Sequence, residues 1–238
     1  VATILVKQST GERAVFFERS TATEPEFLDT HKQLIESAYI LHINGRHRQL
    51  MRSAIAVAKE VGTIISLDGG AQRYDNDMKP ITEASHIVIV ARDYAEKYTG
   101  TTNLEDACRI IHERGALVAG VTDGANGSCF VWPDGTSYRC EPFTQATVVD
   151  TTGAGDSFHG AFLANLVHTI NHMKGQDTTS TTKHDCASIH AVELLKACAH
   201  SDLEKAAIFA SAVASLNTQG IGGRSPLPTL KSVQELIG

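Results

Sequence analysis

Short apolar runs separated by longer amphipathic segments dominate the first half of the chain. Each run is five residues long and rich in β-branched residues, which is typical of buried strands. The intervening segments have the apolar spacing of helices, so the alternation predicts an α/β fold with a mostly parallel sheet covered on both faces. The predicted strands are 39–43, 63–67, 86–90 and 117–121, and the predicted helices are 48–61, 103–114 and a short one that ends at 81–84.

The pattern changes on either side of this region. Residues 3–18 predict a hairpin, because two apolar stretches flank a polar turn at 9–12. Residues 128–132 and 136–140 flank a Pro-Asp-Gly turn and predict a second antiparallel hairpin. The predictions for the rest of the chain are a short strand at 147–149, helices at 155–169, 188–199, 202–217 and 230–237, and a polar, Thr-rich surface insertion at 172–188.

Composition narrows the class of protein. The chain has 238 residues, 42% of them hydrophobic, so we expect residues 1–238 to form one domain around a sizeable core. A net charge of −6 with scattered Lys and Arg argues against nucleic acid as a partner. The apolar runs are too short to cross a membrane, no secretory leader is visible, and the five cysteines form no CxxC pair. We therefore expect a cytoplasmic protein with no membrane partner.

A glycine-rich turn links the strand predicted at 147–149 to the helix that follows. Glycine permits close approach of a ligand, and the N–H groups of Gly153, Ala154 and Gly155, with the positive end of the helix dipole, suit a phosphate. Asp156 begins the same helix, where a carboxylate stays ionised and can accept a proton from an attacking hydroxyl. For a bare GxGD motif, simple helix capping is the commoner explanation.

The longer string DTTGAGDSFHGAF, residues 150–162, resembles the C-terminal signature of the PfkB, or ribokinase-type, family of carbohydrate kinases. The resemblance implies a ribokinase-like three-layer α/β/α sandwich that transfers a phosphoryl group from ATP, with Mg²⁺, to a hydroxymethyl group of a ketose or pentose. It also implies that Asp156 is the general base and that residues 153–155 form the anion hole. A nucleoside kinase of the adenosine type and a non-catalytic nucleotide-binding relative remain as alternatives.

Two more segments resemble the nucleotide site of that family. Residues 121–128 resemble its loop at the nucleotide phosphates, although alone they would indicate a hairpin approach. Residues 208–214 resemble the helix near the adenine, although alone they would indicate a core helix. The residues implied to bind ATP are Thr122, Gly124, Gly127, Ala210 and Val213.

Within the family, residues 43–46 and 90–95 look most like the ketohexokinase branch. Asn44 and Arg46 would then lie near the phosphoryl groups and the substrate. A surface Arg that closes a turn is an equal alternative. Asp68, after the strand at 63–67, resembles a family segment of the D-x-N kind, and we expect it either to be structural or to support the residues that bind the ligand.

Two metal sites follow from the resemblance. Asp150 and Thr152, with the loop 222–225, match the region where many relatives bind a monovalent cation such as K⁺. The N-x-x-E motif that many relatives use to organise Mg²⁺ and phosphate is altered, because Ala91 and Tyr94 stand in its place, and we expect Asp93 to substitute in part.

The chain begins with Val1 and a strand-like run rather than with an initiator Met. Members of the family have further residues before this point, so we expect the N-terminal part of the fold to be missing. The hairpin at 3–18 would then be the remnant of a lid through which a homodimer forms, and a small-molecule sugar is the expected ligand.

Overall fold

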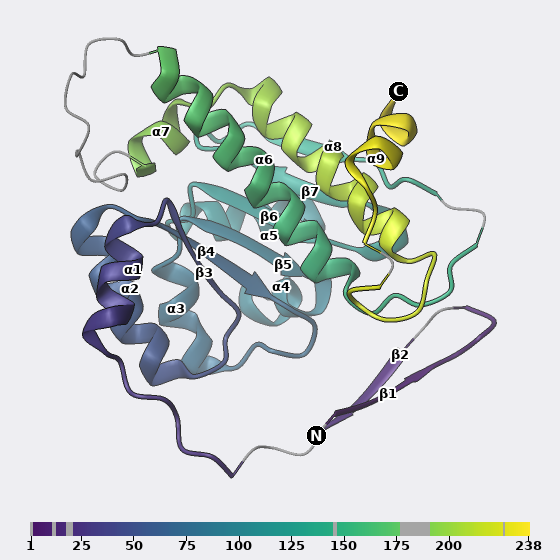
Figure 1. The fold of residues 1–238 in the computed structure, drawn as a ribbon, viewed down its shortest axis with the longest axis horizontal. Coiled ribbons are helices and arrows are strands. Elements are labelled where there is room, and N and C mark those ends of the chain that lie inside the picture. The colour runs from purple at the N-terminus through teal and green to yellow at the C-terminus, as the bar shows by residue number, and fades with distance from the viewer. Residues whose placement is uncertain (1, 11–12, 18–20, 145–146, 177–190, 226) are drawn as a thin grey trace.

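The computed structural model describes residues 2–10, 13–17, 21–144, 147–176, 191–225 and 227–238. The strands of its central sheet are β3 (Ile40–Ile43), β4 (Ile64–Gly69), β5 (Ile87–Ala91), β6 (Val118–Thr122), β7 (Ser128–Val131) and β8 (Ser137–Cys140). They lie in the order β3-β4-β5-β6-β7-β8. β3 to β6 are parallel, and β7 and β8 extend the sheet in antiparallel fashion. Helices cover both faces, which gives three layers (Figure 1).

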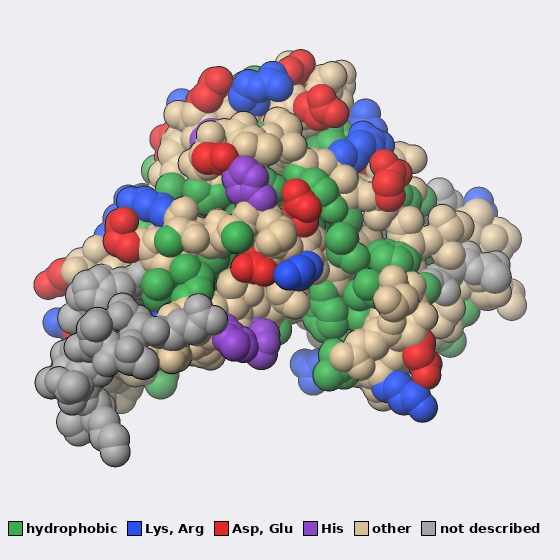
Figure 2. All heavy atoms as spheres, turned by 90° about the horizontal axis from the view of Figure 1, so that it is seen from above, with side chains coloured by type: hydrophobic (Ala, Val, Ile, Leu, Met, Phe, Trp, Pro, Cys, Tyr) green, Lys and Arg blue, Asp and Glu red, His purple; other side chains and the backbone are tan. Residues whose placement is uncertain are grey.

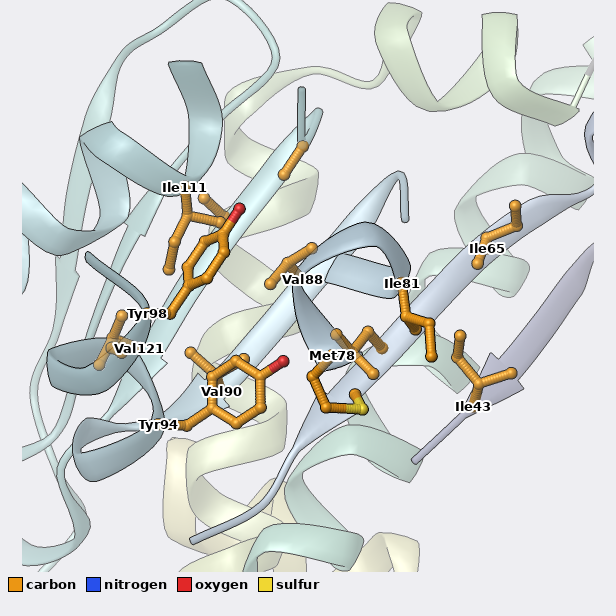
Figure 3. Close-up of a cluster of buried hydrophobic side chains, with 14 of the residues drawn as sticks. Ile43, Ile65, Met78, Ile81, Val88, Val90, Tyr94, Tyr98, Ile111 and Val121 are labelled. Atoms are coloured by element: carbon orange, nitrogen blue, oxygen red, sulfur yellow. The ribbon is translucent and has the colours of Figure 1, made fainter. Parts of the chain in front are cut away.

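The sheet separates two apolar cores. In β5, Val88 and Val90 belong to the first core, whereas Ile87 and Ile89 belong to the second, and all four side chains are fully buried. A strand buried on both faces needs apolar residues at every position, which explains why the sequence shows continuous runs there. Figure 3 shows the first core, in which side chains from the strands meet Met78 and side chains of the helices.

Two groups of helices cover the cores. Their bounds are α1 (Asp29–Ser37), α2 (Arg48–Val61), α3 (Lys79–Glu83), α4 (Arg92–Thr99), α5 (Leu104–Glu113), α6 (Ala154–Gln176), α7 (Ala191–Ala197), α8 (His200–Asn217) and α9 (Leu230–Ile237), with 3-10 turns at Asn76–Met78 and Gly124–Asn126. Helices α1 to α5 contribute to the first core and α6 to α8 to the second. Local caps set several of these ends: the side chains of Asn103 and Thr229 accept N–H bonds at the starts of α5 and α9.

The structure corrects the predictions for the strand at 147–149, the helix at 155–169 and the insertion at 172–188. The strand predicted at 147–149 is wrong, because the N–H groups of Val149 and Asp150 both donate to the carbonyl of Thr218, at 2.8 and 3.2 Å, in a loop contact. The helix after the glycine turn is longer than predicted, and α6 takes in the first residues of the insertion predicted at 172–188. The remainder of that insertion lies outside the described residues. Helices α1 and α4 were not predicted.

The predicted N-terminal hairpin is confirmed. β1 (Ala2–Val6) and β2 (Arg13–Phe17) form a separate antiparallel pair. Figure 1 shows this hairpin projecting away from the three layers. Its apolar side chains are exposed, with 58% of the surface of Leu5 and 59% of that of Phe16 accessible.

The surface carries mixed charge. On the face shown in Figure 2, Lys and Arg side chains are interspersed with Asp and Glu. Within the described ranges, every helix is too short or too polar to cross a membrane.

His86 extends the ladder between β4 and β5 with its side chain. Its backbone N–H donates to the carbonyl of Ile65 at 2.9 Å, and its Nδ1 accepts the N–H of Ile65 at 3.0 Å. Burial lowers the pKa of His86, and the positive charges of Lys59 and Lys196 lower it further. The folded protein therefore holds this imidazole neutral, as an acceptor.

We expect the free energy of unfolding to decrease as the pH falls from 7.5 to 5.5. Below about pH 6.5 the unfolded chain takes up a proton on His86 that the folded chain takes up only at lower pH, which favours unfolding by at most about 1.4 kcal/mol per pH unit. Urea unfolding at the two pH values measures this loss. His86→Asn is the matched control, since its side-chain oxygen can replace Nδ1 but does not titrate; an equal loss in this variant would contradict the assignment.

Candidate active site

The predicted functional residues gather at one edge of the sheet. Strands β3 to β6 run in the same direction, so the segments that follow them meet at their carboxyl ends, where ligands bind in open α/β sheets. The start of α6 carries the glycine-rich turn and Asp156. His159, one turn after Asp156, lies 3.4 Å from Asp68 near the carboxyl end of β4, which places the first turns of α6 at this edge.

The buried carboxylate of Asp150 accepts hydrogen bonds that stabilise the glycine-rich turn. Its side chain is 2% exposed, and one carboxylate oxygen accepts the N–H of Thr152 at 2.8 Å while the other accepts the N–H of Gly222 at 2.9 Å. One buried carboxylate therefore joins the turn before α6 to the loop after α8. Sequence reasoning placed these two segments together through the cation site, and the structure brings them into contact.

Gly153 and Gly223 pack backbone against backbone at the same point. Gly153 has a φ of +80°, and a Cβ added to it would lie 2.5 Å from the Cα of Gly223. Only glycine provides both this conformation and this close approach without strain. The turn is therefore fixed by sterics as well as by hydrogen bonds.

Asn217, at the end of α8, is a further contact that the sequence did not reveal. It is fully buried, and its Nδ2 donates to the carbonyl of Thr152 at 3.3 Å. In the part of the chain that the structure describes, neither its Oδ1 nor the buried Oγ1 of Thr152 has a hydrogen-bond partner. Two unpaired oxygens near the carboxylate of Asp150 are ligands that suit a hard monovalent cation, so these residues fit the predicted K⁺ site.

Asp156 is exposed to solvent in the first turn of α6. Of the three amides predicted to be free, that of Ala154 is engaged, because it donates to the carbonyl of Thr151 at 3.3 Å. No partner is recorded for the N–H groups of Gly153 and Gly155 among the described residues. Gly155 is exposed whereas Gly153 is buried against Gly223, so the N–H of Gly155 and the helix dipole are directly accessible to an anion beside the carboxylate.

The loop after β6 is constrained by a close backbone approach and by side-chain hydrogen bonds. Gly127 has a φ of +82°, and a Cβ there would lie 2.4 Å from the carbonyl oxygen of Cys140. The carboxylate of Asp123 accepts from Arg92 at 2.7 Å and from Asn126 at 3.0 Å, so both ends of the loop are tied down. Thr122 is half-buried and Gly124 is exposed, which leaves both accessible to a ligand.

The two residues predicted on α8 differ in exposure. Ala210 is fully buried in the second core, so its side chain supports the helix and is not available to touch a nucleotide. Val213 is half-buried, and its predicted contact with the nucleotide stays a prediction. The burial of Ala210 favours the interpretation of this segment as a core helix at that position.

A tight turn after β3 carries Asn44 and Arg46. The side chain of Asn44 accepts the N–H of Arg46 at 3.3 Å, and its backbone carbonyl accepts from Arg73 at 3.1 Å. Gly45 and His47 both have positive φ, which bends the chain sharply into α2. Arg46 is exposed at the tip of the turn, where its guanidinium is accessible.

The altered N-x-x-E segment has a structural part. Tyr94 is fully buried, and its hydroxyl is 2.6 Å from that of Thr82. The carboxylate of Asp93 accepts the N–H of Gln72, a residue with a φ of +61°. Asp93 therefore stabilises a left-handed residue in the loop after β4, and this bond already engages the carboxylate that was expected to stand in for the family's glutamate.

A cluster of polar side chains that the sequence did not predict lies one turn along α6 from Asp156. His159 is 4% exposed and Asp68 is 7% exposed, with the Nε2 of His159 3.4 Å from the Oδ1 of Asp68. The ring of His42 lies 5.7 Å from that of His159, centroid to centroid, and its Nδ1 is 3.3 Å from Ser66 Oγ. Burial lowers the pKa of His159, while the charge of Asp68 partly raises it.

The fold is that of sugar kinases of known structure. Over 99% of its length the chain superposes on a ribokinase from Giardia lamblia, with a TM-score of 0.76, 18% identity and 70% of that chain covered. It also superposes, over 99% of its length, on a fructokinase with bound ATP from Xylella fastidiosa, with a TM-score of 0.73, 19% identity and 73% of that chain covered. These likenesses confirm the predicted ribokinase-like α/β fold.

Sequence comparison gives the family. Residues 1–230 match the pfkB family of carbohydrate kinases. The chain is 31% identical over 180 residues to the probable fructokinase-2 of Arabidopsis thaliana, covering 67% of this chain and 53% of that protein. It is 28% identical over 171 residues to the adenosine kinase of Saccharomyces cerevisiae, covering 64% and 48%. The chain belongs to the pfkB family of carbohydrate kinases, and it spans about half the length of these curated relatives.

Proposed function

We propose that the protein is an ATP-dependent phosphotransferase that acts on a hydroxymethyl group of a sugar, a ketose or a pentose. The observation that carries this proposal is the exposed carboxylate of Asp156 at the start of α6, beside the N–H groups of Gly153 and Gly155, which have no backbone partner among the described residues. A proton acceptor and anion-binding amides at one helix terminus are the two elements that phosphoryl transfer to an alcohol requires. Relatives named fructokinase and adenosine kinase support this class of reaction.

In this reaction Asp156 accepts the proton of the acceptor hydroxyl as the hydroxyl oxygen bonds to the terminal phosphorus of ATP. The bond from that phosphorus to the bridging oxygen breaks, and ADP leaves with its electron pair. The N–H groups of Gly153 and Gly155 donate to the phosphoryl oxygens, where negative charge is concentrated in the transition state. Solvent then removes the proton from Asp156, which is exposed.

The nucleotide is proposed to lie along the loop after β6, with its phosphates near Thr122, Gly124 and Gly127 and its base near Val213. Arg46, exposed at the end of β3, is proposed to neutralise phosphoryl charge. Thr152 is proposed to contribute through the turn that it shares with Asp150.

Two metal ions are part of the proposal. When bound, Mg²⁺ neutralises the nucleotide phosphates, and K⁺ supplies positive charge at the turn. Among the described residues, no three His, Cys, Asp or Glu side chains form a metal-binding group. We assign Mg²⁺ to the phosphates and water, and K⁺ to Asp150, Thr152 and Asn217. The Oγ1 of Thr152 and the Oδ1 of Asn217, which have no hydrogen-bond partner in the described part of the chain, carry the K⁺ assignment.

A nucleoside acceptor is the second candidate, favoured by the match to an adenosine kinase. A panel assay of ADP release by the full natural protein, with ketoses, pentoses and nucleosides as acceptors, distinguishes the two candidates. We expect release that depends on a sugar. A nucleoside as the preferred acceptor would overturn the sugar assignment, and no release with any acceptor would favour a non-catalytic nucleotide-binding relative.

The hairpin of β1 and β2 is proposed to contact a second copy of the chain. Its exposed apolar side chains, which include Leu5 and Phe16, would be covered in such a dimer. Sedimentation of the full protein tests this, and a purely monomeric species would contradict it. A cytoplasmic location, where ATP is abundant, fits the proposed reaction.

A further inference from the structure

Two buried polar side chains lie where the pattern of their elements calls for apolar ones. Asp68 follows the buried apolar residues of β4, a strand whose six residues are all buried. His159 lies on the buried side of α6, next to Phe158 and close to Phe162. A buried carboxylate costs free energy unless a polar partner compensates it, and the Nε2 of His159, at 3.4 Å, is the partner that the structure provides.

The position of this pair relates it to the site. His159 follows Asp156 by three residues, so the two are neighbours one turn apart on α6, with Asp156 exposed at the start of the helix and His159 buried. The pair therefore connects the helix that carries the proposed base to the carboxyl end of β4. The Gly153–Gly223 contact and Asp150 fix the turn before the helix, whereas this contact acts on the helix itself and restricts its rotation.

Within the described ranges, the polar side-chain contact found for the ring of His159 is the one with Asp68. Its Nδ1 is buried without a hydrogen-bond partner in the described ranges of the chain. The charged and titratable groups that face the ring are Asp68, His42, Asp156 and Arg73. Of these, the carboxylate of Asp68 is the group within ion-pair distance of the ring, at 3.4 Å from its Nε2.

We propose that Asp68 and His159 are a positioning pair that sets the orientation of Asp156 toward the acceptor hydroxyl. This inference rests on the proposed function. A directional polar contact can specify one rotation of a helix, whereas apolar side chains alone tolerate several. A displacement of about 1 Å at a reacting group is enough to lower turnover about 100-fold, so a positioning contact of this kind affects the rate.

The test compares two amide substitutions of different reach. In His159→Gln the side chain is long enough for its amide nitrogen to occupy the place of Nε2 beside Asp68, whereas the side chain in His159→Asn is too short to reach it. We expect the Asn variant to lose about 10- to 100-fold in kcat, with the KM for ATP within about twofold of the wild-type value, and the Gln variant to recover most of that loss. Equal kcat values for the two variants, or a wild-type kcat in His159→Asn, would overturn the proposal.

A second measurement does not need kinase activity. The charge of Asp68 raises the pKa of His159, so Asp68→Asn should lower the pKa of that ring in an NMR titration of the full protein. An unchanged pKa would refute the contact. If the wild-type protein transfers no phosphoryl group to any acceptor, the proposed function fails on the panel assay, whereas the contact still stands or falls on this titration.

Discussion

Asp156→Asn is expected to lower kcat about 10²- to 10⁴-fold, the range that a positioned general base contributes, while the Kd for ATP stays close to that of the wild type. The amide has nearly the same shape as the carboxylate but cannot accept the hydroxyl proton. Since Asp156 is exposed at the helix start, the substitution leaves both cores intact. Initial rates at saturating ATP and acceptor, together with calorimetric ATP titration, measure the two quantities.

Asp202→Asn is the matched control for this variant. Asp202 also lies in the first turn of a helix, at the opposite end of α8 from Asn217, and pairs with Lys205 at the surface, at 3.2 Å. Such surface pairs contribute little to stability, so wild-type rates are expected. If Asp156→Asn turned over at a similar rate to this control, Asp156 would be a helix-capping residue and not the base.

Gly153→Ala is expected to destabilise the protein by about 3 kcal/mol or more and to reduce kcat strongly. A left-handed conformation costs a residue with a Cβ about 1–2 kcal/mol. The added Cβ would also lie 2.5 Å from the Cα of Gly223, and backbone atoms cannot rotate away as a side chain could. The turn and the loop must separate, which moves the start of α6. Urea unfolding and initial rates measure the two effects.

Gly160→Ala provides the comparison. Gly160 lies within the same helix, is exposed, and an added Cβ would meet nothing within 4 Å. Alanine is a better helix former, so this variant should gain up to about 1 kcal/mol. Equal stability of the Gly153→Ala and wild-type proteins would show that the turn yields easily, and would contradict the steric account of the site.

The sequence predicted the elements whose signals are local. Helix α2 was predicted with its observed bounds, because its apolar spacing is regular and Gly62 ends it in a left-handed conformation. The strand predicted at 147–149 failed for a reason that local sequence does not contain. The N–H groups of Val149 and Asp150 bond to the carbonyl of Thr218, about seventy residues further along the chain, instead of to a neighbouring strand. The polar, short helix α4 gave too weak a period to be recognised.

The same division holds in the candidate site. A contiguous motif placed Asp150, Gly153 and Asp156 in one turn, and the structure agrees. The contact of Asn217 with Thr152 and the contact of Asp68 with His159 were not predicted. Each contact joins residues from elements that are distant in the sequence, and a single Asn, Asp or His does not reveal its partner. Burial is what makes these residues informative, and burial of a single polar residue is not visible in one sequence.

The close packing of Gly153 on Gly223 has a mechanical consequence. Where two backbone segments are in contact with no side chain between them, no side chain can change rotamer to accommodate a displacement. A shift of the loop at 220–223 is therefore transmitted whole to the first turn of α6. Whatever binds or alters that loop acts on the proposed base as directly as a substitution in the turn itself.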